Sequence, residues 1–228
     1  MTPTFRDRAV LLGETLVVAD LHLGRGRTSA VEAPMGDGRD VIDRLTDLLD
    51  TVEPETVVLA GDVLHAFETV PDGASERFAT IRARVADAAA ELVVVAGNHD
   101  GMLTAVWDGT ATDAYRLDEQ TLVVHGHEIP EESAERYVFG HDHPAIEIEG
   151  RRHPCFLRGP GGPDGTEVLV LPAFNRFTAG VPINTMAADD FQSPLIRDAD
   201  VLAPVVRDDA AGETLSFPPL ASFRHRLR

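Results

Sequence analysis

Lysine is absent from this sequence, and all 20 basic residues are arginines, against 38 acidic residues. The formal net charge is therefore −18, and the pI is near 4.7. A high-GC genome with a solvated acidic surface would explain this bias. We favour adaptation to high salt, a halophilic protein, because dense carboxylates keep a surface hydrated. Such a charge argues against nucleic acid partners, which bind largely through cationic side chains, although the argument loses force in molar salt.

Disulfides and membrane spans are missing as well. Cys155 is the single cysteine, so no disulfide can form within the chain, which is usual for intracellular proteins. No apolar run approaches the roughly 18 residues that a membrane-spanning helix requires, and residues 1–8 are mostly polar. We therefore expect a cytoplasmic protein without a membrane partner, and nothing in the sequence indicates its oligomeric state.

Five short clusters of histidine, carboxylate and amide residues are the most informative feature that is present. Each cluster directly follows a short apolar run, which is the pattern of a buried strand that ends in a polar loop. Together they offer enough ligands for two metal ions and one further histidine for chemistry. The clusters are Asp20-Leu21-His22, Gly61-Asp62, Gly97-Asn98-His99-Asp100, His125-Gly126-His127 and Gly140-His141-Asp142-His143.

The 228 residues predict one α/β domain with two sheets. Strands and helices alternate in the first half, whereas helices become scarce after Gly101, where we expect a second, mostly antiparallel sheet. We divide the chain into a domain of residues 1–188 and a C-terminal extension of residues 189–228, which could form an edge hairpin packed on the same domain. Strands are expected at Ala9–Leu12, Thr15–Ala19, Val57–Ala60, Leu92–Ala96, Tyr115–Leu117, Leu122–His125, Tyr137–Gly140, Ala145–Ile148, Cys155–Leu157 and Val168–Leu171, and helices at Arg39–Thr51, after a Ser75 cap, and around Met102–Trp107.

The clusters contain the ligands for two metal sites of mixed nitrogen and oxygen character. Asp20 and His22 stand two residues apart at a strand end, so both can bind one ion. Asp62 follows a glycine that permits a sharp turn, and its two oxygens can bridge two ions. The remaining ligands are the carbonyl oxygen of Asn98 and the imidazoles of His125, His141 and His143. Such ligands suit Mn²⁺ first, and Fe or Zn²⁺ as alternatives.

Two ions about 3.5 to 4 Å apart acidify a bridging water and bind both the attacking and the leaving oxygen of an in-line phosphoryl displacement. The predicted reaction is therefore hydrolysis of a phosphoester. His99, beside Asn98, is the predicted catalytic residue that stabilises the transition state or protonates the leaving alkoxide. Asp100 is predicted to orient the imidazole of His99.

Each residue also has a simpler interpretation. A single buried histidine is more often a hydrogen-bonded core residue than a ligand, but five clusters at successive strand ends reverse those odds. His127 faces either the substrate or the solvent, and His65 either lines the mouth of the site or packs locally. Arg25 and Arg27 follow His22 closely and are candidates for binding substrate phosphate, with surface ion pairing as the alternative.

At these residues the chain resembles the calcineurin-like metallophosphoesterase superfamily, whose pattern D-x-H, G-D, G-N-H-[DE], H and G-H-x-H is matched in full. The resemblance implies a four-layer α/β sandwich of two mixed β-sheets flanked by helices, with the metals at the carboxyl ends of strands. It also makes His99 the catalytic histidine. By the same resemblance one ion is held by Asp20, His22, Asp62 and His143, and the other by Asp62, Asn98, His125 and His141.

Flanking residues resemble a narrower group, the ICC-like branch that includes the ligase-associated DNA-repair phosphoesterase. The similarity covers about Ala9 to Asn184 and implies a phosphodiesterase or nuclease in nucleic acid processing. In contrast, His65 and Ala66 replace the Asp-Arg of protein Ser/Thr phosphatases, and the part after Asn184 is too small for the DNA-capping domain of Mre11-type nucleases. The flanking motifs are Asp20–Gly24, Gly61–His65, Gly140–Ala145 and Leu171–Asn175.

Three functions from different classes therefore compete. The leading one is a dimetal phosphodiesterase, with nucleic acid or a small diester as substrate. The second is a phosphomonoesterase that acts on small phosphorylated metabolites and uses the same ligands. The third is a metal-binding scaffold without activity, which the presence of His99 disfavours.

Overall fold

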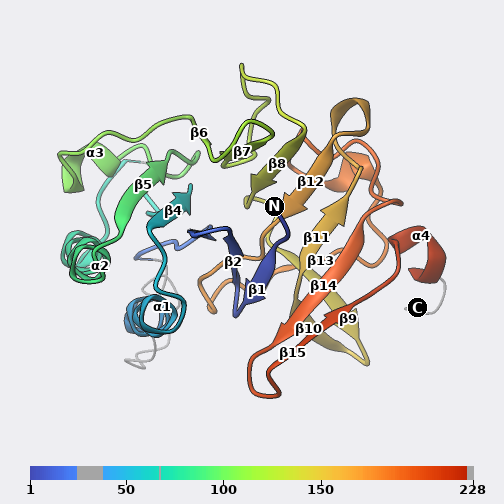
Figure 1. Cartoon of the computed structure of the whole chain (residues 1–228), viewed down its shortest axis with the longest axis horizontal. Coiled ribbons are helices and arrows are strands. Elements are labelled where there is room, and N and C mark those ends of the chain that lie inside the picture. The colour runs from blue at the N-terminus through green and yellow to red at the C-terminus, as the bar shows by residue number, and fades with distance from the viewer. Residues whose placement is uncertain (25–37, 67, 225–228) are drawn as a thin grey trace.

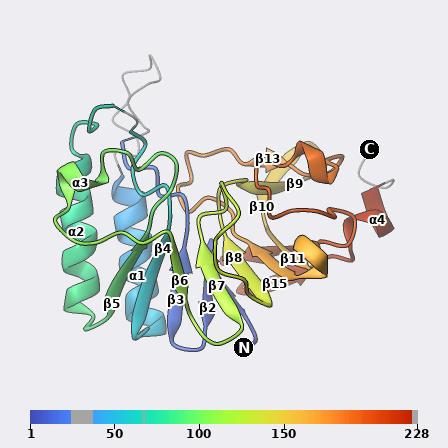
Figure 2. The same cartoon turned by 90° about the horizontal axis from the view of Figure 1, so that it is seen from above.

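The computed structural model describes residues 1–24, 38–66 and 68–224 of the chain. Within them the backbone forms an α/β sandwich built on two mixed sheets, as predicted. From one side to the other, the layers are a pair of helices, a five-stranded sheet, a seven-stranded sheet, and an outer layer that contains a three-stranded sheet (Figures 1 and 2). This order places the two larger sheets face to face.

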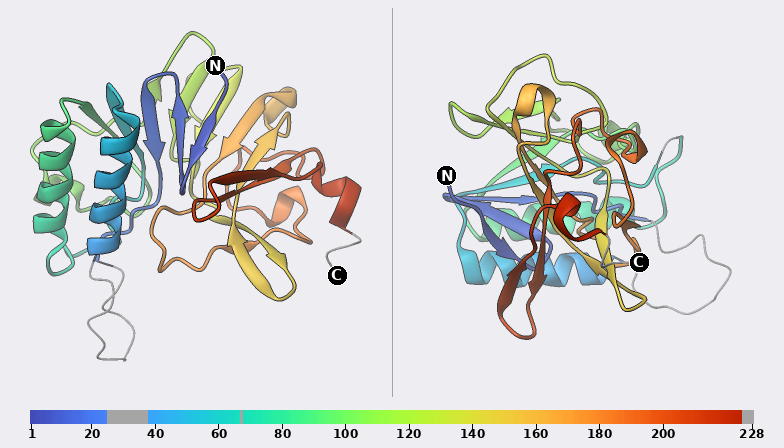
Figure 3. Two further views of the ribbon diagram at one scale, coloured as in Figure 1. Left: turned by 60° about the horizontal axis from the view of Figure 1, so that its bottom comes forward. Right: turned by 90° about the vertical axis from the view of Figure 1, so that its right-hand side faces the viewer.

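The five-stranded sheet has the order β1-β2-β3-β4-β5. Strands β1, β2 and β3 are antiparallel neighbours, whereas β3, β4 and β5 run parallel. Parallel neighbours need a crossover, and helices α1 and α2 connect them on the outer face, as Figure 3 shows. The elements are β1 (Thr4–Arg6), β2 (Ala9–Leu12), β3 (Thr15–Val18), α1 (Arg39–Val52), β4 (Thr56–Ala60), α2 (Ala74–Asp87) and β5 (Glu91–Val95).

Helix α1 agrees with the predicted span to within one residue, but α2 starts differently from the prediction. Ser75 was expected to cap α2, whereas the N-cap is Gly73 and Ser75 lies inside the first turn. Gly73 has a φ of 71°, a left-handed conformation that glycine adopts without a steric penalty. The chain therefore turns into the helix through this glycine, not through a hydroxyl cap.

The seven-stranded sheet has the order β15-β14-β11-β12-β8-β7-β6. Its central strands β12, β8 and β7 are parallel and its other neighbours antiparallel, so the sheet is mostly antiparallel, as expected. Strands β14 and β15 form a hairpin at one edge. The strands are β6 (Ala114–Arg116), β7 (Thr121–Val124), β8 (Arg136–Phe139), β11 (Phe156–Gly159), β12 (Glu167–Val170), β14 (Ala203–Asp208) and β15 (Glu213–Ser216).

The outer layer was not anticipated in this form. It contains a three-stranded sheet of order β10-β9-β13 and several short helical turns (Figures 1 and 2). The described part of the chain contains no helix long and apolar enough to cross a membrane. The remaining elements are α3 (Leu103–Val106), β9 (Pro144–Ile148), β10 (Arg151–Pro154), β13 (Val181–Pro182), α4 (Leu220–Phe223) and the 3-10 helices Pro163–Gly165 and Ala188–Asp190.

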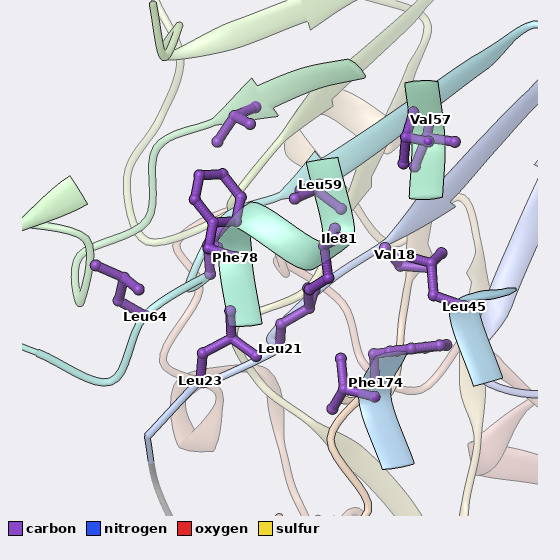
Figure 4. Close-up of a cluster of buried hydrophobic side chains, with 14 of the residues drawn as sticks. Val18, Leu21, Leu23, Leu45, Val57, Leu59, Leu64, Phe78, Ile81 and Phe174 are labelled. Atoms are coloured by element: carbon purple, nitrogen blue, oxygen red, sulfur yellow. The ribbon is translucent and has the colours of Figure 1, made fainter. Parts of the chain in front are cut away.

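Successive side chains of a strand point to opposite faces of its sheet, so separate hydrophobic cores form between the layers. In β3, Leu16 and Val18 face helices α1 and α2, whereas Val17 packs between the two large sheets. Figure 4 shows the core under the helices, where Phe78 and Ile81 of α2 lie against the sheet. Each such buried side chain contributes roughly 1.5 to 3 kcal/mol, so both faces of the five-stranded sheet are fixed against a neighbouring layer.

Candidate metal centre

The five polar clusters follow the carboxyl ends of β3, β4, β5, β7 and β8. The first three are parallel neighbours in one sheet, and β7 and β8 are parallel neighbours in the other. Because parallel strands end at the same edge of a sheet, the loops from both sheets meet at one end of the sandwich. Residues up to 123 positions apart in sequence therefore lie in one site.

A first donor group consists of Asp20, His22 and His143. The Nε2 atoms of His22 and His143 lie 3.2 Å apart, and Nε2 of His143 lies 3.2 Å from Oδ1 of Asp20. Asp62 approaches the same group, with its Oδ2 3.9 Å from Nε2 of His22. Four predicted ligands from both sheets thus converge on one point.

A second donor group contains Asp62, His125 and Asn98. His125 Nδ1 lies 3.1 Å from the carbonyl oxygen of Ala60, which can only accept, so Nδ1 carries the proton and Nε2 has a free lone pair. That Nε2 lies 3.0 Å from Oδ1 of Asn98 and 3.3 Å from Oδ1 of Asp62. The ring of His141 lies 4.9 Å from that of His125. Lone pairs that converge in this way repel one another unless a cation lies between them, so the group fits a divalent ion.

Five of the predicted ligands have a left-handed backbone, which side chains other than glycine rarely adopt. Each such residue costs roughly 1 to 2 kcal/mol, so the strain is concentrated in this site. Hydrogen bonds between the loops hold it, for example from the amide of His22 to the carbonyl of Asp62 at 2.9 Å. The φ values are 57° for Asp20, 44° for His22, 50° for Asp62, 68° for His141 and 47° for His143.

Gly97 and Gly140 are required because the two central carboxylates lie close to their backbone. A Cβ on Gly97 would lie 2.3 Å from Oδ1 of Asp62, and one on Gly140 would lie 2.3 Å from Oδ2 of Asp20. Without a Cβ at these glycines, backbone amides can reach the carboxylates. The amide of His99, for example, donates to Asp62 Oδ1 at 2.9 Å. The glycines therefore let the loops close around both carboxylates.

The two central carboxylates differ in their affinity for protons. Burial alone would raise the pKa of Asp20, but the imidazoles around it, above all that of His143, outweigh burial and hold the pKa at about 2. For Asp62, burial and then the charge of Asp20 raise the pKa to about 8. Burial and the neighbouring His125 lower the pKa of His141 to about 4. The imidazole of His141 is thus neutral at pH 7, as a metal ligand must be.

His99 lies at the mouth of the first donor group. Its Nε2 is 3.8 Å from Oδ2 of Asp62, and its ring is perpendicular to that of His22, with centroids 5.5 Å apart. The ring of His65 stacks on that of His99, with a centroid distance of 5.2 Å and an interplanar angle of 19°, and it also lies 5.2 Å from the ring of His22. His99 therefore stands beside the converging donors.

Asp100 binds backbone amides of neighbouring loops, and its predicted role of orienting the imidazole of His99 stays a prediction. Its carboxylate accepts hydrogen bonds from the backbone amides of Leu64 at 2.8 Å, Gly97 at 2.9 Å and Val63 at 3.3 Å. Burial raises the pKa of this carboxyl, against the effect of these bonds. The structure thus places Asp100 as a link between the loops that carry Asp62 and Asn98.

Of the three predicted substrate-binding residues, the structure describes only His127. The ring of His127 lies 5.3 Å from that of His125 and 6.2 Å from that of His141, and its side chain is partly exposed. Arg25 and Arg27 lie outside the described residues. His127 therefore borders the second donor group, and the role of the two arginines stays a prediction.

Asn175 is a residue of this region to which sequence reasoning assigned no role. Its side-chain amide donates to the carbonyls of Leu21 at 2.9 Å and His22 at 3.4 Å, and its backbone amide donates to the carbonyl of Asp20 at 3.3 Å. It thus binds the strained loop that carries two predicted ligands. The only signal for it in the sequence is the flanking motif Leu171–Asn175.

Three comparisons with known proteins indicate which proteins this chain is similar to. The chain resembles the crystal structure of nuclease MPE from Pseudomonas putida with a TM-score of 0.65 and 24% identity over 92% of each chain. It also aligns with Yfce, a phosphoesterase from E. coli, over 90% of this chain and 98% of that one, with a TM-score of 0.44 and 16% identity. No curated protein matches the sequence. Residues 14–154 match the calcineurin-like phosphoesterase family. The chain therefore belongs to this family and is a metal-dependent phosphoesterase.

Proposed function

We propose that the protein is a dimetal phosphodiesterase. The observation that carries this proposal is the convergence of two donor groups on Asp62, whose oxygens lie 3.3 Å from Nε2 of His125 and 3.9 Å from Nε2 of His22. A carboxylate in this position can bridge two cations. Phosphodiesters suit such a pair because both oxygens of the in-line displacement need charge stabilisation.

Each ion would be held by residues of both sheets. Asp20, His22, Asp62 and His143 would hold the first, and Asp62, Asn98, His125 and His141 the second. Mn²⁺ is the first choice because the ligands are imidazoles and hard oxygens without a thiolate, and Fe or Zn²⁺ are alternatives. When bound, the ions supply positive charge for the phosphate oxygens and make a bound water more acidic.

The chain's own residues perform the remaining steps. His99 stabilises the charge that develops on phosphorus-bound oxygen, or gives a proton to the leaving alkoxide. Its main chain is fixed because its amide donates to Asp62. Asp100 holds the loops of Asp62 and Asn98 together, and His127 contacts substrate beside His125.

The substrate class has two candidates, a small diester and nucleic acid. The flanking motifs and the nuclease activity of the similar Pseudomonas protein suggest DNA processing or repair. The net charge of −18 favours a small diester at ordinary ionic strength. A phosphomonoesterase on small metabolites remains the alternative that uses the same ligands.

The test is a kinetic comparison of bis-p-nitrophenyl phosphate with p-nitrophenyl phosphate, with Mn²⁺, at low and molar salt. The diester is expected to have the higher kcat/KM. A preference for the monoester would support the alternative and contradict the proposal. If neither ester is hydrolysed, the result would support the third hypothesis, a metal-binding scaffold without activity.

The domain boundaries and cellular location belong to the same proposal. Residues 1–188 would form the phosphoesterase domain and residues 189–228 an extension packed on it, since β14 pairs with β11 of the seven-stranded sheet. The single cysteine and the absence of a long apolar run in the sequence support a cytoplasmic location.

A further inference from the structure

A cavity of about 490 Å³ opens beside the second donor group. His125 and His127 line it, together with Gly97, the residue before Asn98. Its volume lies within the roughly 300 to 1,000 Å³ of small-molecule pockets. An ester whose phosphate is bound at the metal centre can therefore extend one of its organic substituents into this cavity.

The charged residues in the lining have one sign. Four carboxylates line the cavity, those of Asp113, Glu128, Glu131 and Glu132, and all four residues are exposed. The lining, as far as the structure describes it, includes no arginine. Arg116 binds Glu132 from outside the lining, with Nη2 2.8 Å from Oε2. The net charge of the cavity lining is therefore negative even when Arg116 neutralises Glu132.

The remaining lining includes apolar side chains beside the polar Thr112. Ala96, Ala114 and Val124 form part of it, and Ile129 and Pro130 contribute from the loop that follows β7. Ile129 is 55% exposed although it is a large hydrophobic residue. A polar cavity that combines carboxylates with a few apolar side chains fits a group that has both a hydrocarbon portion and a positive charge.

We propose that this cavity binds an organic substituent of the phosphoester and selects a substituent that is cationic, such as a quaternary or protonated amino alcohol. The inference rests on the proposed function, because the phosphate must be held at the metal centre beside His125. The carboxylates attract the ammonium group at short range. They repel a second phosphate, so each further nucleotide of a DNA strand is disfavoured in this direction.

The chemistry is that of simple hydrolysis. Water forms a new bond from its oxygen to phosphorus, and the bond from phosphorus to one ester oxygen breaks. The departing oxygen receives one proton, so the products are an alcohol and a phosphomonoester. The cationic group is unchanged in this reaction, and it affects binding alone.

The test uses the full chain with Mn²⁺ and two diesters of equal shape. One is p-nitrophenyl phosphorylcholine, and the other is 3,3-dimethylbutyl p-nitrophenyl phosphate, in which carbon replaces the charged nitrogen. At low ionic strength we expect kcat/KM to be about tenfold higher for the choline ester, since close opposite charges attract strongly there. In about 1 M salt the Debye length falls to about 3 Å, and the preference should shrink.

Variants connect this preference to the cavity. Asp113→Asn with Glu131→Gln removes two charges from the lining and should reduce the preference to about twofold or less. Asp87→Asn with Glu213→Gln makes the same change at exposed positions on α2 and β15 and should leave the preference intact.

Three outcomes would overturn the inference: equal hydrolysis of the two esters by the wild-type protein, a preference that survives in the Asp113→Asn/Glu131→Gln variant, or faster cleavage of a single-stranded oligonucleotide than of the choline ester. Equal hydrolysis leaves the proposed phosphodiesterase standing. In contrast, no hydrolysis of any diester by the wild-type protein contradicts the proposed function itself.

Discussion

Asp62 lies between the two donor groups, and its protonation limits what they can bind. It shares the centre with Asp20, and the two carboxylates have opposite pKa shifts because imidazoles surround Asp20, whereas Asp62 is buried beside the charge of Asp20. A divalent cation supplies the positive charge that this arrangement lacks. The same residues have strained backbone conformations, which the contacts between loops hold in place.

Metal affinity should rise with pH because of Asp62. A carboxyl whose pKa is raised to about 8 is mostly protonated at pH 7, and a cation must displace that proton. We expect Mn²⁺ binding to release about one proton per chain at pH 7 and close to none at pH 9. Calorimetry in buffers of different ionisation enthalpy measures this number, and binding without proton release at pH 7 would contradict the pKa shift.

Replacing His99 with alanine should separate metal binding from turnover. The imidazole lies beside the converging donors but is not one of the proposed ligands. The variant is expected to retain its metal content and lose about 10²- to 10⁴-fold in kcat, the usual contribution of a general acid. His153→Ala, on β10, is the matched control and should keep full activity. Unchanged turnover in His99→Ala would remove His99 from the mechanism.

At the level of elements, the site depends on hydrogen bonds between the loops that carry the predicted ligands. The loop after β12 contributes Asn175, which binds the loop after β3, and Asp100 links the loops after β4 and β5. Such partners orient ligands without touching a metal, and their loss typically weakens metal affinity. The position of each predicted ligand therefore depends on the neighbouring loops as well as on its own loop.

Asn175→Ala is expected to lower Mn²⁺ affinity about 10- to 100-fold, because the loop of Asp20 and His22 loses its side-chain clamp. The matched control is Asn184→Ala. Asn184 makes an equivalent pair of bonds to the backbone of Glu147, both 2.8 Å long, but away from the metal centre. Mn²⁺ titrations of both variants measure the loss of affinity, and their unfolding midpoints measure the loss of stability. Equal losses of affinity would show that Asn175 acts only through general stability.

Local patterns were sufficient for some elements and failed for others. Four strands of the five-stranded sheet, β2 to β5, and both crossover helices follow from apolar patterns, which are a local signal, whereas β1 (Thr4–Arg6) was not predicted. In the small outer sheet only β9 was predicted, because β10 has the sequence Arg-Arg-His-Pro and β13 contains two residues. Both of these strands pair with β9, so they depend on partners that their own sequences do not indicate.

The same limit applies within the site. The five clusters are visible in the sequence because each lies within a few consecutive residues. Two of the three partners of Asp100 are not visible, since its carboxylate binds amides 36 and 37 positions earlier in the chain as well as that of the nearby Gly97. Asn175 similarly binds a carbonyl 154 positions away. Long-range contacts of this kind depend on how the loops pack, which no local pattern encodes.

At the scale of the whole molecule, the metal centre requires both sheets. Asp20 and His22 follow a strand of the five-stranded sheet, and His143 follows a strand of the seven-stranded sheet. A shared apolar core that includes Val17, Val58 and Val138 lies between them. The two halves of the site therefore come together only when this core is packed.

The net charge of −18 should make stability depend on salt. Carboxylates at this density repel one another, and added ions screen that repulsion. We expect the Tm of the metal-free protein to rise steadily as KCl increases from about 0.1 M to about 2 M. Thermal unfolding followed by circular dichroism measures it, and a Tm that is constant or falls over this range would argue against salt adaptation.

The most direct test of the central claim is anomalous X-ray diffraction from crystals grown with Mn²⁺. We expect two manganese peaks bridged by Asp62, one bound by Asp20, His22 and His143 and the other by Asn98, His125 and His141. A single peak, or peaks away from these residues, would contradict the dimetal centre.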